Sequence, residues 1–280
     1  KGKKIRPILV ILSAKLVGNV NERTYVAANL VELLHTATLI HDDVVDEAKT
    51  RRGIASINAV WKNKAAVLIG DYLLSSGLLL AVEAKEHTFL QYTSEAVKSM
   101  SEGELLQIQK ARNFDATEET YFKVIKDKTA SLLKSCCKMG ALSATSNEEH
   151  VERLGVFGEN LGIAFQLQDD YLDYAGRKKL LGKSVGNDLK EKKFTLPLII
   201  SLNNAPKKKS AEIMKLIKSD SKKKFDIVHD FVYEYGGMEY TQNKIKEYSL
   251  KAKEAICIFK ETETKKSLLK LVDFLEIREH

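Results

Sequence analysis

Proline and alternating apolar–polar runs are both scarce in this sequence of 280 residues, which holds three prolines. Proline removes a helical hydrogen bond and clashes with the preceding turn, so the long stretches without it leave room for long helices. Alternating runs mark half-buried strands, and none is convincing here. Since 44% of the residues are hydrophobic, the chain can bury a large core. We predict an all-α protein with a single domain over residues 1–280.

Cysteine is also rare, which excludes a disulfide framework. The three cysteines are Cys136, Cys137 and Cys257, and the adjacent pair cannot form a bridge without strain. A reducing, cytoplasmic setting is therefore predicted, with Cys136 and Cys137 packed inside a helix.

Long uninterrupted hydrophobic runs are lacking as well. The most apolar stretch, residues 65–82, contains Asp71, so we expect a buried core helix and no transmembrane segment. The net charge is +7, but charges of both signs are spread along the chain, which does not indicate nucleic acid. The lysines at 207–209 and 222–224 are predicted to be solvated. The missing initiator methionine suggests that an N-terminal helix is absent from this sequence.

Helical spacing of apolar residues is what the sequence does contain. It predicts two helices, with apolar spacing over residues 26–40 and 154–172, that run directly into acidic clusters. Further helical patterns cover residues 64–84, 88–112, 117–145, 195–204, 208–218, 221–235, 237–260 and 262–277.

The two acidic clusters share one spacing. Asp42 and Asp46 are four residues apart, as are Asp169 and Asp173. On a helix this places both carboxylates on one face, about 6 Å apart. Each pair can hold a divalent cation, and Mg²⁺ commonly bridges a few carboxylates to substrate phosphates. We expect the two helix ends to face one another around shared magnesium and a phosphate-bearing ligand.

Ordered motifs along nearly the whole chain resemble the trans-isoprenyl diphosphate synthases, the polyprenyl synthetase family. They are "KGKKIRP", "ELLHTATLIHDDVVDEAKTRRG", "KDKTASL", "FQLQDDYLDY" and "GKSVGNDLKEKKFTLP". The resemblance implies the isoprenoid synthase fold, a bundle of about ten or more helices around a central substrate cavity. It also implies a homodimer, with contacts in the helices after Trp61. Lys1, Asn187 and Lys192 depart from the family's usual residues.

Roles are carried over by position from this resemblance. Three Mg²⁺ ions are implied once diphosphate is bound, with Asp42, Asp46 and Asp169 as principal ligands and Asp173 as an outer one. The residues implied to hold isopentenyl diphosphate are Lys3, Arg6, His35 and Arg52. Those implied to surround the allylic diphosphate are Arg51, Lys128, Thr129, Gln166, Lys183 and Lys193. Of these residues, Asp42, Asp46, Arg51, Lys128 and Asp169 are predicted to act in catalysis.

The expected reaction is ionisation of an allylic diphosphate, attack by the double bond of isopentenyl diphosphate, and elimination of a proton. Ala37 and Thr38 precede Asp42 at positions where this family's short-chain members often carry aromatic residues that block the growing tail. Both residues are small here, which predicts a medium or long all-trans product, such as a quinone side-chain precursor. If each helical turn admits one isoprene unit, the product is of about octaprenyl size.

Three alternatives remain at this point. One is a short-chain farnesyl or geranylgeranyl diphosphate synthase, and another is a class I terpene cyclase built on a similar bundle. The third is a noncatalytic subunit that only binds prenyl diphosphates. The second aspartate cluster and the predicted isopentenyl-binding cations favour chain elongation.

Overall fold

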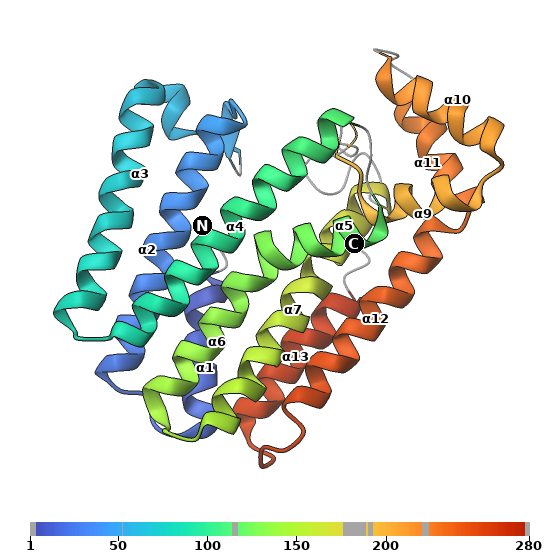
Figure 1. Ribbon diagram of the computed structural model, residues 1–280. Coiled ribbons are helices and arrows are strands. Elements are labelled where there is room, and N and C mark those ends of the chain that lie inside the picture. Colours follow the sequence, from blue (N-terminus) through green and yellow to red (C-terminus); the bar gives the residue numbers. More distant parts are fainter. Residues whose placement is uncertain are drawn as a thin grey trace. The chain divides into compact units, whose positions relative to one another are not determined.

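The computed structural model of the chain describes residues 4–51, 53–113, 117–175, 189, 193–219 and 224–277, and helices dominate it (Figure 1). The prediction of an all-α protein is confirmed. The helices are α1 (Ile5–Val17), α2 (Glu22–Val45), α3 (Ile57–Glu83), α4 (His87–Asn113), α5 (Glu118–Ile125), the π-helical turn η1 (Lys126–Ala130), α6 (Ser131–Ala144), α7 (Glu148–Ala175), α9 (Leu196–Asn204), α10 (Lys207–Lys218), α11 (Lys224–Glu234), α12 (Gly237–Ala255) and α13 (Glu263–Ile277).

Two compact units divide the chain. The first comprises Lys1–Glu95 with Ser135–Gly155, and the second comprises Ala96–Lys134 with Val156–His280. The helices α4, α6 and α7 contribute residues to both units. The interpretation of residues 1–280 as one domain stays a prediction.

Within the first unit, α2 packs against α1 and α3. A capping box begins α2: the Asn21 side chain accepts from the Thr24 N–H, and the Thr24 hydroxyl accepts from the Asn21 N–H. This arrangement satisfies backbone donors that have no partner in the first turn. The Asn21 amide also donates to the Ser143 carbonyl at 2.8 Å, which fixes the start of α2 against the end of α6.

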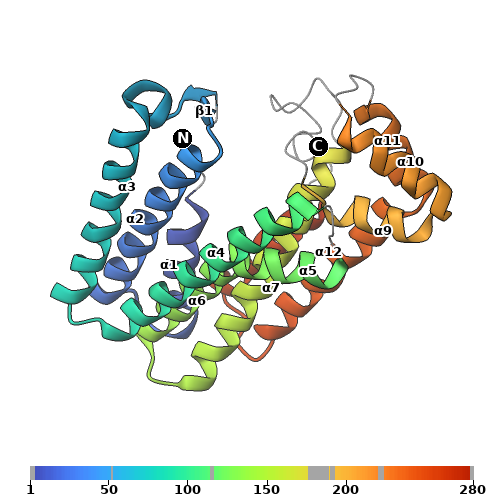
Figure 2. The ribbon, with the colours of Figure 1, turned by 45° about the horizontal axis from the view of Figure 1, so that its top comes forward.

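A short hairpin follows α2 and was not predicted. Thr50–Arg51 (β1) pairs antiparallel with Ile54–Ala55 (β2), just beyond the end of α2 (Figure 2). These two-residue strands are the only ones among the described residues.

Helix α3 corrects the expectation of a buried core helix at residues 65–82. This helix is long and apolar enough to cross a membrane by length and composition alone. Only 22% of its most apolar window is buried, which contradicts the predicted core position. Trp61, Leu68 and Tyr72 are each about two-thirds exposed, at 68%, 67% and 71%. The sequence identified an apolar helix correctly but could not show that this chain leaves much of it uncovered.

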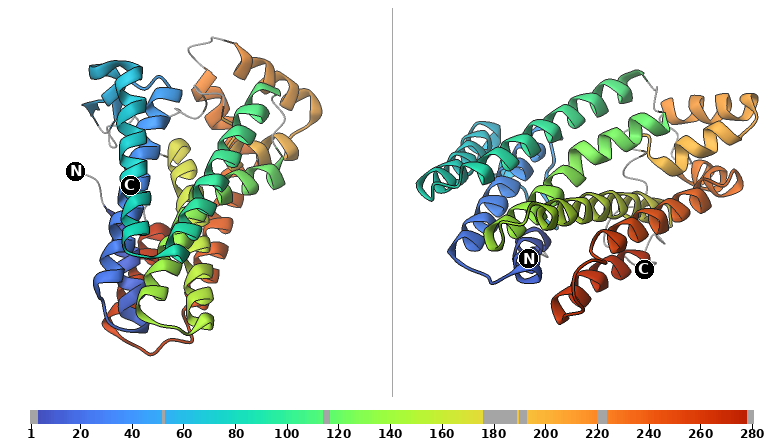
Figure 3. Two further views of the ribbon diagram at one scale, coloured as in Figure 1. Left: turned by 60° about the vertical axis from the view of Figure 1, so that its left-hand side comes forward. Right: turned by 60° about the horizontal axis from the view of Figure 1, so that its bottom comes forward.

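Two clusters of buried side chains form the core of the second unit. The first cluster joins α5, η1, α7, α9 and α12 through Tyr121, Ile125, Ala130, Ile163, Leu167, Leu196, Ile199, Ile200 and Ile245. The second lies mainly around α9, α10 and α11 and includes Leu198, Ile213, Ile217, Val228, Phe231 and Val232. The helices α12 and α13 lie side by side in every view (Figure 3).

The cysteine prediction is confirmed for the pair in α6, where Cys136 and Cys137 are buried and free. Burial disfavours the charged thiolate and raises the pKa of Cys137 to about 12. These thiols therefore act as small apolar core residues. The lysines at 207–209 are exposed, as predicted, whereas residues 222 and 223 lie outside the described part of the chain.

Candidate active site

The first acidic cluster lies where α2 ends. Asp42 is half-buried in the last turn, and Asp46 is the exposed C-cap residue. The Asp46 N–H donates to the Asp42 carbonyl at 2.8 Å, so the helical spacing extends through both residues. The predicted one-turn separation of these two aspartates is therefore present in the backbone.

Asp43, between them, has a different environment. It is 5% exposed, and its Oδ1 accepts a hydrogen bond from Nε of Arg51 at 2.8 Å and forms an ion pair with Nη2 at 2.8 Å. The Asn58 amide donates to the Asp43 carbonyl at 3.0 Å, which links the start of α3 to this turn. Arg51, predicted to bind the allylic diphosphate, is thus oriented by a buried carboxylate.

Arg6 and His35, both predicted to hold isopentenyl diphosphate, are brought together. Arg6 Nη1 lies 2.8 Å from His35 Nε2. Because a guanidinium can only donate, His35 must accept at Nε2. The other predicted residues of this group, Lys3 and Arg52, lie outside the described residues, as does Lys183.

In the second unit, Lys128 and Thr129 lie in the π-helical turn η1. The Ser131 N–H donates to the Lys126 carbonyl, five residues back. Such turns are rare and often occur at functional sites. Two glycines allow neighbouring helices to approach this turn closely, because neither carries a Cβ. A Cβ at Gly103 of α4 would lie only 3.1 Å from the Lys128 backbone nitrogen, and a Cβ at Gly162 of α7 would lie only 2.6 Å from the Ala130 Cα.

Carboxylates hold the lysines around this turn. Lys128 Nζ pairs with Glu104 and donates to Gln107 Oε1 at 3.1 Å. Glu159 of α7 binds Lys126 at 2.8 Å and Lys134 at 2.7 Å. Burial opposes the ionisation of Glu159, but hydrogen bonds from the two lysines outweigh it and hold its pKa below the ordinary value.

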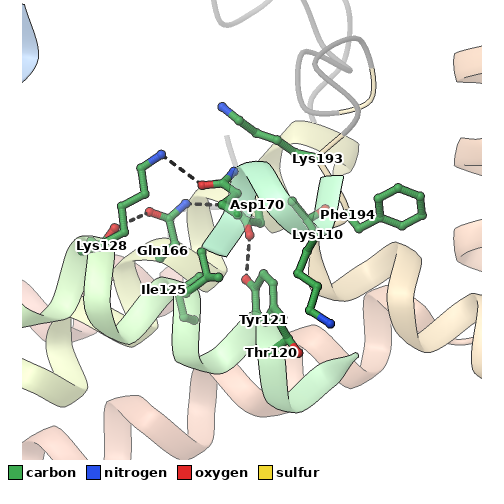
Figure 4. Close-up of a pocket in the computed structure, with 13 residues that line it drawn as sticks. Lys110, Thr120, Tyr121, Ile125, Lys128, Gln166, Asp170, Lys193 and Phe194 are labelled. Atoms are coloured by element: carbon green, nitrogen blue, oxygen red, sulfur yellow. Dashed lines mark hydrogen bonds between the residues drawn. The ribbon is translucent and has the colours of Figure 1, made fainter. Parts of the chain in front are cut away.

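A chain of hydrogen bonds connects the turn to the second acidic cluster on α7 (Figure 4). Thr129 Oγ1 donates to Gln166 Oε1 at 2.9 Å, and Gln166 Nε2 donates to Asp170 Oδ1 at 2.8 Å. The Tyr121 hydroxyl donates to Asp170 Oδ2 at 2.6 Å. Asp170 is 5% exposed, whereas Asp169 and Asp173 are half-buried.

These groups line a cavity of about 130 Å³. It includes four residues predicted to surround the allylic diphosphate: Lys128, Thr129, Gln166 and Lys193. The other lining residues, which sequence reasoning did not assign to a site, are Gln107, Lys110, Thr120, Tyr121, Val124, Ile125, Asp170, Phe194 and Thr195. A signal existed for Tyr121, because it lies four residues before Ile125 and seven before Lys128 and so shares their helix face.

The donor chemistry of the acidic clusters fits magnesium. Within the described part of the chain, no group of three or more His, Cys, Asp or Glu side chains is arranged to hold a metal ion. Pairs of carboxylates suit Mg²⁺, which keeps several waters and binds through one or two carboxylates together with substrate phosphates. Asp42 with Asp46, and Asp169 with Asp173, are such pairs. Asp42 and Asp46 belong to the first unit, and Asp169 and Asp173 belong to the second. That the two pairs share one ligand therefore stays a prediction.

The two predicted chain-length positions differ in exposure. Ala37 is 1% exposed, and Thr38 is half-buried with its hydroxyl donating to the His35 carbonyl at 2.9 Å. Thr38 is therefore the more accessible of the two.

Comparison with known proteins gives consistent matches. The polyprenyl synthetase family profile matches residues 1–234. The chain is 36% identical over 271 residues to the octaprenyl diphosphate synthase of Haemophilus influenzae, which covers 96% of this chain and 82% of the relative. It resembles the structure of a polyprenyl synthase from Caulobacter crescentus CB15 complexed with calcium and isoprenyl diphosphate, with a TM-score of 0.92 and 34% identity, covering 100% of this chain and 86% of that one. It also resembles a geranylgeranyl pyrophosphate synthetase from Pyrococcus horikoshii, with a TM-score of 0.93 and 32% identity, covering 99% and 86%.

Proposed function

The chain belongs to the polyprenyl synthetase family, and on this premise we propose that it is a magnesium-dependent trans-prenyltransferase. It condenses isopentenyl diphosphate with an allylic diphosphate and releases pyrophosphate. The observation that carries this proposal is a cavity lined by Lys110, Lys128 and Lys193 together with residues of α7, the helix that carries Asp169 and Asp173.

The cationic side chains suit a departing diphosphate. Lys128 is held by Glu104 and Gln107, so its ammonium is positioned before any substrate arrives. Arg51 is held by Asp43, and its guanidinium can present donors to phosphate oxygens. Preorganised charges of this kind stabilise the charge that develops on a leaving group.

Mg²⁺ would be held by Asp42, Asp46, Asp169 and Asp173 and, when bound, neutralises charge on the diphosphate. The chain's own residues supply the remaining requirements. The Arg6–His35 pair is assigned to isopentenyl diphosphate, and Thr129 with Gln166 to the allylic substrate. Because both substrates are held in place, positioning provides much of the rate enhancement and no side-chain nucleophile is needed.

The product is proposed to be a medium or long all-trans polyprenyl diphosphate. Small side chains at Ala37 and Thr38 support this length, as does the similarity to an octaprenyl diphosphate synthase. The similarity to a geranylgeranyl synthetase supports a shorter product, so the number of condensations must be measured.

A homodimer through α3 is proposed as the assembled form. Trp61, Leu68 and Tyr72 are exposed on this helix, and large exposed apolar patches mark interaction sites. A second copy of the chain is the occupant that the family resemblance favours.

The direct test is incorporation of labelled isopentenyl diphosphate by the purified chain, with farnesyl diphosphate as primer and Mg²⁺ present. We expect elongated products that disappear with a chelator, and at least about a hundredfold loss of rate in Asp42→Asn. Asp230→Asn is the matched control, since Asp230 is an exposed aspartate on α11, away from both acidic clusters in the sequence. Binding without incorporation would identify a noncatalytic subunit, and release of a cyclic hydrocarbon from farnesyl diphosphate alone would identify a terpene cyclase.

A further inference from the structure

Each acidic cluster also contains one buried aspartate, Asp43 at the end of α2 and Asp170 on α7. Both of its carboxylate oxygens accept hydrogen bonds, one from Gln166 and one from Tyr121. The Tyr121–Asp170 bond is 2.6 Å long and joins residues 49 positions apart, from α5 to α7. A hydrogen bond between a hydroxyl and a buried carboxylate at this distance is a strong constraint.

We propose that Tyr121 is a positioning residue for the allylic substrate, acting through Asp170 and Gln166 on Thr129. This role rests on the proposed prenyltransferase function. It differs from the roles of Asp169 and Asp173, because Asp170 points its oxygens toward neighbouring side chains inside the cavity wall (Figure 4).

The carboxylate of Asp170 determines the direction of every bond in the chain. An ionised carboxylate only accepts, so Gln166 must turn its NH₂ group toward Asp170. The Gln166 carbonyl then faces Thr129, whose hydroxyl must donate its hydrogen to it. As a result, the Thr129 oxygen keeps only lone pairs for the cavity, which suits a positively charged allylic group better than a phosphate oxygen.

Tyr121 completes this arrangement by holding the second oxygen of Asp170. Without this hydroxyl, the buried Asp170 loses one of the donors that orient its carboxylate, so the carboxylate can rotate more easily. Rotation would disturb Gln166 and Thr129 together, because each takes its orientation from the next. Tyr121 itself is 6% exposed and lies in the cavity wall.

The test is Tyr121→Phe, which removes one oxygen atom and keeps the ring in the core. We expect kcat/KM for the allylic diphosphate to fall about tenfold, while KM for isopentenyl diphosphate changes by less than about twofold. The double variant Tyr121→Phe/Thr129→Val should lose less than the product of the two single effects, because both changes interrupt one chain.

Tyr240→Phe is the matched control. The Tyr240 hydroxyl also donates to a carboxylate at 2.6 Å, that of Glu118 on the same helix α5, but Tyr240 does not line the cavity. A general loss of α5 stability would therefore affect both variants alike. Equal kinetics in the two variants, or parallel losses for both substrates, would overturn the positioning role.

A second measurement separates this proposal from the proposed function. Calorimetric titration with farnesyl diphosphate and Mg²⁺ requires no turnover, and we expect several-fold weaker binding in Tyr121→Phe than in Tyr240→Phe. If the wild-type chain binds this probe but never elongates it, the prenyltransferase proposal fails, whereas the binding difference still decides the role of Tyr121.

Discussion

Arg51 donates a hydrogen bond from Nε to Oδ1 of the buried Asp43 at 2.8 Å, and its Nη2 forms an ion pair with the same oxygen at 2.8 Å. The pair joins the strand β1 to the last turn of α2. It therefore holds a cation of the hairpin beside the aspartates that are proposed to bind magnesium. Asp43, which lies between Asp42 and Asp46 in the sequence, therefore binds a side chain of the protein.

This relationship predicts the effect of Asp43→Asn. Removing the charge weakens the hold on Arg51, so we expect kcat/KM for the allylic diphosphate to fall about tenfold with the fold retained. Steady-state kinetics and circular dichroism would measure the two effects. Asp230→Asn provides the control, because Asp230 is exposed on α11 and lies beside His229. Unchanged kinetics in Asp43→Asn would show that Arg51 needs no such support.

Thr38→Phe is expected to shorten the product. The half-buried Thr38 can carry a ring into the predicted path of the growing tail, whereas Ala37→Phe would overpack a buried position and cost about 1–3 kcal/mol. Chromatography of the products would show the change. Thr36→Phe should leave product length unaltered, since Thr36 lies about 200° away around the helix. A full-length product from Thr38→Phe would reject the assignment of the tail path.

Glu159 is predicted to stabilise the second unit in a pH-dependent way. Its pKa is lowered from 4.5 in the folded state, so its contribution is present above that value and is lost as pH falls through the lower folded pKa. We expect Glu159→Gln to reduce the free energy of unfolding by about 1 kcal/mol near neutral pH, allowing for the exposed lysines.

Urea denaturation at several pH values would test this. The difference between wild type and Glu159→Gln should shrink steadily below about pH 4.5. Glu212→Gln is a suitable control, because its pair with Lys209 is long, at 4.0 Å, and exposed on both sides. A difference that persists at low pH would mean that packing, and not the charge, explains the loss.

Leu68→Lys is expected to convert a dimer into monomers. A charge placed at the exposed Leu68 would be costly inside an apolar interface between two α3 helices. Light scattering coupled to gel filtration would report the mass. Leu250→Lys alters a comparably exposed leucine on α12 and should leave the dimer intact. A wild-type chain that is already monomeric at all concentrations would contradict the assignment.

The helices were largely predictable because apolar spacing is a local property. The patterns at residues 88–112 and 262–277, for example, correspond to α4 and α13 within one residue at each end. The acidic spacing at Asp42 and Asp46 was also readable, since helical geometry follows directly from a separation of four residues.

Other features depended on information that local patterns lack. The predicted helix over 117–145 contains the π-turn, whose hydrogen bonds leave no periodic signal. The hairpin strands are too short to alternate. Hydropathy identified α3 as apolar but could not show what covers it. The bond between Tyr121 and Asp170 joins distant segments, and only the fold brings such residues together.

The π-turn at Lys126–Ala130 has a consequence for engineering this chain. Deleting one residue there would restore the ordinary winding of a continuous helix from α5 to α6 and gain regular hydrogen bonding. The same deletion would swing Lys128 and Thr129 by about 100° away from their present partners. Selection for thermal stability alone would therefore favour a regular helix at the expense of activity. Such a conflict between stability and activity is typical of functional sites with irregular backbone.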